Sequence, residues 1–173
     1  MSILAPLHAV LARTGLDAVI LVPVANFRRV FRKDGVDLAG PGGTATQSRV
    51  GREGTDGTLI GHGAMVATLL DAAELAASEG TSLEVIDLRS LSPVDYGPIL
   101  DSVRKTGRAI VAQEAPQHAS LGSEIAATIA ERAFYSLEAP VLRVSGFDVP
   151  FPPAKLEGVY LPDADRILEA VDR

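Results

Sequence analysis

From residue 47 onward, short apolar runs alternate with longer segments in which apolar residues recur at helical spacing. In the clearest of these segments, residues 64–78, Val66, Leu69 and Ala73 fall on one helical face. Strands that alternate with helices of this length are typical of a mostly parallel sheet covered on both faces. The sequence therefore predicts an α/β three-layer sandwich. The predicted strands are 58–61, 83–88, 108–113 and 141–144, and the predicted helices are 64–78, 92–104, 123–136 and one that opens at 162–165.

Residues at the ends of these segments carry helix start and stop signals. Ser92 is a good N-cap residue and Pro93 suits the first helical position, so we expect a helix to begin there and to end at Gly107. The last helix opens with acidic residues at its positive end. Residues 48–50 read as a short extended lead-in to the first strand.

The first 46 residues have a different character. They contain a short helical pattern over 6–13, an apolar run over 17–23 and a basic segment over 27–33, followed by a glycine-rich linker at 40–44. We expect a domain boundary after residue 46, with residues 1–46 as a prelude and residues 47–173 as the main domain.

Charge and composition narrow the classes of partner. The net charge of −6 argues against nucleic acid, because phosphate binding requires clustered lysine and arginine, and it suits a basic protein partner. The chain has no cysteine, which excludes disulfides and thiolate chemistry. No apolar run approaches the roughly 20 residues of a membrane span, and the first residues lack a signal-peptide pattern. We expect a cytoplasmic protein that binds neither membrane nor nucleic acid.

The candidate cofactor and metal motifs are incomplete. Gly61-His62-Gly63 follows a strand like a phosphate-binding turn, but valine occupies the position of the third glycine, so a tight strand-to-helix turn is favoured. The segment 33–35 lacks the first glycine and the downstream asparagine of a diphosphate motif. The histidines, His8, His62 and His118, are too far apart to predict a metal site. We therefore assign no catalytic, cofactor-binding or metal residue.

Two polar loops follow predicted strands, where open α/β sheets carry their functional surface. Glu114 stands at the end of one strand, as a functional carboxylate or as a plain hydrogen-bond acceptor, and we favour the second. An acyl-transfer set of Ser120, Ser123, His118 and Glu114 is disfavoured, since closeness in a loop does not create the required geometry. Residues 147–153 are proline-rich with two aromatics, and suit a docking surface, a stiff cover over a sheet edge, or both.

The order of five segments resembles the transketolase-like C-terminal domain of the β subunit of thiamine-diphosphate-dependent 2-oxoacid dehydrogenases, of the branched-chain or pyruvate type. The segments are REGTDGTLIGHGAMV, VIDLRSLSPVD, EAPQHASLGSEI, LEAPVLRVSGFDVPFP and YLPDADRILEAV. The resemblance covers residues 50–173. It implies an α/β heterotetramer that holds thiamine diphosphate and Mg between an α-subunit domain and the pyrimidine-binding domain of β. It further implies that the β C-terminal domain packs subunits together and docks the dihydrolipoyl acyltransferase.

The resemblance also implies particular residues and partners. The basic binding domain of the acyltransferase would contact Glu138, in the segment 137–140, and the C-terminal carboxylate at Arg173, which match the docking surface by position. The other expected partners are the α subunit and a second β subunit. Residues 1–46 faintly resemble the end of a pyrimidine-binding domain and cannot supply a whole one, so we expect this chain alone to bind no cofactor and to be inactive. The alternatives are a stand-alone, non-catalytic protein-interaction module and the equivalent domain of a transketolase or a deoxyxylulose phosphate synthase.

Overall fold

The computed structural model describes residues 47–173. The predictions made for the prelude (the helix at 6–13, the strand at 17–23, the basic segment at 27–33 and the linker at 40–44) lie outside the described residues, as do His8 and the segment 33–35. The domain boundary after residue 46 stays a prediction. Among residues 47–173, none of the helices has the length and apolar character that crossing a membrane requires.

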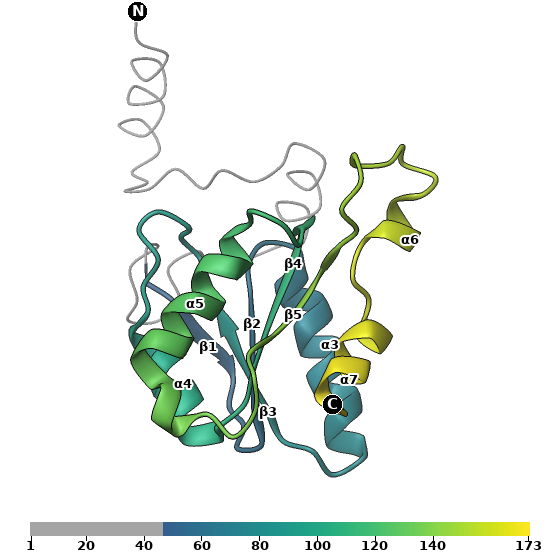
Figure 1. The fold of residues 1–173 in the computed structure, drawn as a ribbon. Helices are drawn as coiled ribbons and strands as arrows, with labels where there is room; N and C mark the ends of the chain where they lie inside the picture. Colours follow the sequence, from purple (N-terminus) through teal and green to yellow (C-terminus); the bar gives the residue numbers. More distant parts are fainter. Residues whose placement is uncertain (1–46) are drawn as a thin grey trace, which may run out of the picture.

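A five-stranded sheet with the order β1-β3-β2-β4-β5 forms the centre of the domain. β2, β3, β4 and β5 run parallel, and β1 pairs antiparallel with β3 at the edge. The parallel strands therefore begin at one edge of the sheet, the amino edge, and end at the other, the carboxyl edge (Figure 1). The strands are β1 (Arg49–Arg52), β2 (Gly57–Gly61), β3 (Leu83–Asp87), β4 (Ala109–Pro116) and β5 (Leu142–Gly146).

Helices cover both faces of this sheet because the central strands are apolar on both sides. In β2, Leu59 packs into the cluster beneath α3 and α7, whereas the next residue, Ile60, packs into the opposite cluster beneath α4 and α5. Both side chains are fully buried. The predicted α/β three-layer sandwich is confirmed (Figure 1). The helices are α3 (Met65–Ser78), α4 (Gly97–Thr106), α5 (Leu121–Ala133) with the 3-10 turn Phe134–Ser136, α6 (Glu157–Tyr160) and α7 (Ala164–Val171).

The predicted start of α4 was wrong. The helix begins at Gly97 rather than near Ser92, with Pro98 in its first turn and the Asp95 carboxylate accepting a hydrogen bond from the Gly97 N–H at 3.1 Å. The stretch before the helix is instead tied to the residue that precedes β1, because the Asp95 carbonyl accepts a hydrogen bond from the Ser48 hydroxyl at 2.8 Å. Gly107 ends α4 as predicted, in a left-handed conformation with φ 71°.

Two further elements differ from the prediction at the carboxyl edge. β4 continues to Pro116, so Glu114 lies within the strand rather than in the loop after it. The extension is made by pairing with β5, where Pro116 is opposite Gly146 after a shift in register. The short helix α6 was not predicted.

Candidate functional site

At the carboxyl edge, Gln113 organises the loop between β4 and α5. Its side chain is buried and uses both ends of the amide: the oxygen accepts from the Gly122 N–H at 2.8 Å, and the nitrogen donates to the Pro116 carbonyl at 3.0 Å. A Cβ at position 122 would lie 2.7 Å from the Gln113 oxygen, so a larger residue there would push the Gln113 amide out of this position. Gln113 therefore holds the start of α5 against the end of β4.

His118 at the tip of this loop pairs with Asp148, which follows β5. The His118 N–H donates to one carboxylate oxygen of Asp148 at 3.1 Å, and its Nδ1 lies 2.5 Å from the other. The hydrogen bond from the His118 N–H, with that from the imidazole, lowers the pKa of the Asp148 carboxyl. The His118 side chain is 87% exposed, as expected for a loop residue that faces solvent.

The serines of the disfavoured acyl-transfer set bond to the backbone and to a neighbouring arginine instead. Ser120 and Ser123 both donate to the carbonyl of Gln117, at 3.1 and 3.2 Å, and Arg143 donates to the Ser123 hydroxyl at 2.5 Å. His118 is bonded to Asp148, so a nucleophile–base pair is not assembled from these side chains. Glu114 is half-buried in β4.

The turn after β2 is explained by packing. A Cβ on Gly61 would lie 2.6 Å from Leu69 of α3, so glycine lets the helix approach the strand closely. Burial lowers the pKa of the neighbouring His62, which favours the neutral imidazole. Within residues 47–173, no three histidine or carboxylate side chains gather in a way that could hold a metal ion.

At the amino edge, a hydrogen bond holds the backbone of Glu138 in place, whereas its carboxylate is exposed to solvent. Its N–H donates to the carbonyl of Gly107 at 2.8 Å, which joins the segment before β5 to the turn before β4. The carboxylate lies 3.7 Å from Nε of Arg108, and the two side chains are 69% and 57% exposed. An exposed pair of this kind contributes about 0–1 kcal/mol, so the Glu138 carboxylate remains available to another cation.

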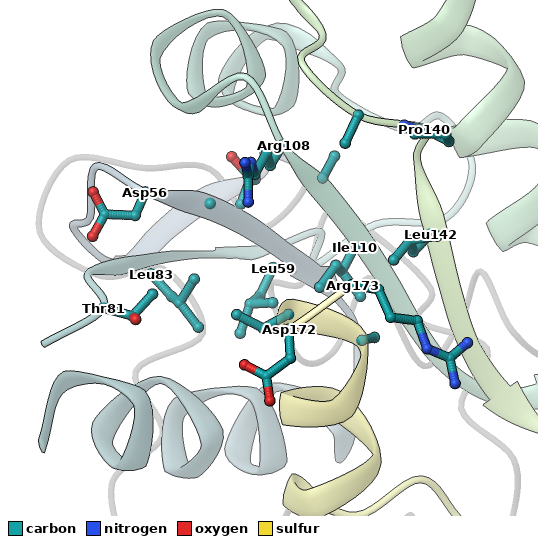
Figure 2. Close-up of a pocket in the computed structure, with 16 residues that line it drawn as sticks. Asp56, Leu59, Thr81, Leu83, Arg108, Ile110, Pro140, Leu142, Asp172 and Arg173 are labelled. Carbon is teal, nitrogen blue, oxygen red and sulfur yellow. The ribbon is translucent and has the colours of Figure 1, made fainter. Parts of the chain in front are cut away.

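Arg173 lies at the same edge and pairs with Glu169, one helical turn earlier, at 2.5 Å. A cavity of about 330 Å³ separates the strand starts from the C-terminal end of α7, and both Arg173 and Arg108 line it. Figure 2 shows the apolar floor of this cavity, to which Leu59 and Leu83 contribute. Glu138 contacts Arg108, which lines the same cavity as Arg173. The structure thus brings the two predicted partner-binding residues to one edge of the sheet. The other charged residues that line the cavity are Asp56 and Asp172.

Comparison with known proteins gives concordant matches. A family model described as the transketolase C-terminal domain matches residues 46–167. The β subunit of the pyruvate dehydrogenase E1 component from Leifsonia xyli is 68% identical over 126 residues, which are 73% of this chain. The 3-methyl-2-oxobutanoate dehydrogenase β subunit from Mycobacterium tuberculosis is 46% identical over 147 residues, or 84% of this chain. A solved split-gene transketolase, described as an inactive β4 tetramer, superposes on 74% of this chain with a TM-score of 0.64 and 34% identity.

These matches cover only part of each relative. The chain spans 37% of the Leifsonia β subunit, 42% of the Mycobacterium β subunit and 41% of the split-gene transketolase chain.

Proposed function

We propose, since this chain belongs to the transketolase C-terminal domain family, that it serves as the C-terminal domain of the β subunit of a 2-oxoacid dehydrogenase. The identities of 68% and 46% to a pyruvate and a 3-methyl-2-oxobutanoate dehydrogenase β subunit support this assignment. The decarboxylating component of such a complex converts a pyruvate-like or branched-chain 2-oxo acid and transfers the acyl group onward. That activity belongs to the assembled enzyme.

The described part of this chain does not fit the cofactor of that enzyme, thiamine diphosphate with Mg. Residues 47–173 present no cluster of carboxylates for a metal ion. In the strand-to-helix turn that resembled a phosphate site, Gly61 is explained by its close packing against Leu69. We therefore assign this domain no part in holding the cofactor and derive no chemical step from it.

The function we assign to the domain is assembly and docking, with Glu138 as the anchor for the dihydrolipoyl acyltransferase. The observation that carries this proposal is a glutamate whose backbone N–H is bonded to the Gly107 carbonyl while its side chain is 69% exposed. With Glu138, the acidic side chains at this edge are Asp56, Glu169 and Asp172, and they outnumber the two cations, Arg108 and Arg173. Such a surface suits a basic binding domain, which approaches faster and in a fixed orientation when the charges are complementary.

We also assign the α subunit and a second copy of the β chain as partners. The name "subunit beta" of the relatives supports the first of these. The solved split-gene transketolase, 34% identical to this chain, is described as a β4 tetramer, which supports association between copies.

Calorimetric titration of this chain with the isolated subunit-binding domain of the acyltransferase tests the docking proposal. Glu138→Gln should weaken binding at least about tenfold, the equivalent of roughly 1.4 kcal/mol, because a charge-assisted contact is lost. Glu131→Gln is the matched control, since Glu131 is an exposed acid on α5. Equal affinity for wild type and Glu138→Gln, or an equal loss in the two variants, would contradict the role of Glu138.

A further inference from the structure

The cavity at the amino edge, with a volume of about 330 Å³, has an apolar floor and a charged rim. Four apolar side chains from the parallel strands form the floor, namely Leu59, Leu83, Ile110 and Leu142. Much of the remaining lining consists of small residues, including Gly57, Ala109, Ala139 and Ala170. The volume lies at the lower end of the range for small-molecule pockets, which is about 300–1,000 Å³. The cavity therefore suits a small ligand with an apolar body.

The rim of the cavity carries one acid and one arginine on each of two sides. Asp56 and Arg108 directly precede β2 and β4 at the strand starts, whereas Asp172 and Arg173 directly follow α7. Figure 2 shows these four side chains around the apolar floor. A ligand with a carboxylate alone meets two acids, and a ligand with an amine alone meets two arginines, so each is opposed by like charge. A ligand that carries both groups can pair each of them with its opposite.

The two arginines differ in how firmly their present partners hold them. Arg173 donates a hydrogen bond to Glu169 at 2.5 Å. Arg108 lies 3.7 Å from Glu138 through its Nε, a distance too long for a hydrogen bond. A guanidinium group has five N–H donors in a geometry that matches a carboxylate. Arg108 is therefore the better partner for the carboxylate of a ligand.

The two acids differ in the same way. The Asp56 carboxylate already accepts hydrogen bonds from the Ser82 N–H at 2.7 Å and from the Thr55 hydroxyl at 2.9 Å. Asp172 stands at the C-terminal end of α7, where the carbonyl groups of the last turn add a partial negative charge. Asp172 and these carbonyls are therefore the better partners for an ammonium group.

We infer that the amino-edge cavity binds a free aliphatic α-amino acid, with its side chain on the apolar floor, its carboxylate at Arg108 and its ammonium group at Asp172. The site discriminates against the 2-oxo acid with the same side chain. That molecule lacks the ammonium group and brings a net negative charge to an edge where acids outnumber cations. The inference does not depend on the docking role, because Glu138 is not among the residues that line the cavity.

Titration of the whole chain with L-leucine, followed in amide NMR spectra, tests this inference. We expect saturable shifts at lining residues such as Gly57, Ala139 and Val171, with a dissociation constant of about 1 mM or lower. Three related probes each lack one recognised group. Glycine lacks the apolar side chain, the amine formed by decarboxylation of leucine lacks the carboxylate, and the 2-oxo acid of leucine lacks the ammonium group. Each probe should bind at least about tenfold more weakly than leucine.

Substitutions at the rim test the assigned contacts. Arg108→Gln and Asp172→Asn should each weaken leucine binding at least about fivefold, because each removes a charge-assisted contact. The matched controls are Arg104→Gln and Asp101→Asn, at an exposed ion pair on α4 outside the cavity. Glu138→Gln should bind leucine no more weakly than the wild type, since it removes a competing carboxylate from Arg108. Thermal melting verifies that all five variants are folded.

Three outcomes would overturn the inference. The first is the absence of saturable shifts at about 10 mM leucine, tenfold above the expected limit. The second is a 2-oxo acid or an amine that binds as tightly as leucine. The third is a loss of binding in the control variants equal to that in Arg108→Gln and Asp172→Asn. A failed docking titration with intact leucine binding would reject the docking role alone, and intact docking without leucine binding would reject this inference alone.

Discussion

Replacing Lys105 by methionine should destabilise the domain strongly at neutral pH, because Lys105 is the counter-charge of a buried carboxylate. Glu84 of β3 has a side chain that is 3% exposed, and Lys105 of α4 bonds to it directly. Lys105 also reaches Glu53 at 3.3 Å, and the Gly54 N–H donates to Glu84 at 3.2 Å. Lys105→Met keeps most of the aliphatic stem and removes the charge, so the loss reports on the ion pair.

The expected magnitude follows from the burial of the two partners. Breaking a fully buried ion pair by removing one member destabilises a protein by about 3–5 kcal/mol. Here Lys105 is 43% exposed, so water reaches the vacated position and screens part of the uncompensated charge. The N–H of Gly54 still solvates the carboxylate. We therefore expect a loss of about 2–3 kcal/mol in the free energy of unfolding at pH 7, measured by urea denaturation.

The pH dependence of this loss has a definite sign. Burial opposes ionisation of Glu84, but the hydrogen bonds from Lys105, Ser102 and Gly54 outweigh it and lower its pKa. In the wild type the pair thus stabilises the fold above the ordinary glutamate pKa, and this stabilisation is lost as pH falls through the lowered pKa. Without Lys105, burial dominates and raises the folded-state pKa, so the variant should regain stability as pH falls from 7 toward about 4.3.

Two comparisons can refute this reasoning. The double variant Glu84→Gln/Lys105→Met should be more stable at pH 7 than Lys105→Met alone, because it no longer buries an uncompensated charge. Lys155→Met, at an exposed lysine, is the control and should change stability by less than about 0.5 kcal/mol. If Lys105→Met unfolds at the wild-type urea concentration, or if the double variant is no more stable than the single one, Lys105 does not compensate a buried charge.

Two smaller predictions concern the carboxyl edge. Gly146→Ala should lower stability by about 1–3 kcal/mol in thermal unfolding, because its Cβ would lie 2.4 Å from the Glu114 carbonyl oxygen. The control Gly158→Ala, at a position with open space around it, should have little effect. Equal melting temperatures for the two variants would contradict this prediction. His118→Ala should raise the pKa of Asp148 only part of the way to its ordinary value, since the backbone N–H still donates. A carbon-detected NMR titration of the Asp148 carboxyl measures this, and a complete return would show that the imidazole alone holds the pKa down.

The layered core could be predicted from the sequence because it depends on local periodicity. The helix expected over 64–78 is α3, Met65–Ser78, with Leu69 and Ala73 buried as their spacing indicated. The start of α4 could not be predicted in the same way. Ser92 and Pro93 have the residue types of a helix start, but the segment before α4 is held by Ser48, 47 residues from Asp95 in sequence. A local signal was overridden by a tertiary contact.

The candidate sites show the same limit more strongly. Glu138 and Arg173 were assigned by resemblance, and their spacing in the sequence predicts neither the cavity that Arg173 lines nor the contact of Glu138 with Arg108. Asp148, which fixes His118 from 30 residues away, was missed as a contact residue. Arg143, the charged residue in β5, is a signal in the sequence for a polar contact at the carboxyl edge, and it donates to the Ser123 hydroxyl. Pairs of this kind join elements that only the sheet order brings together.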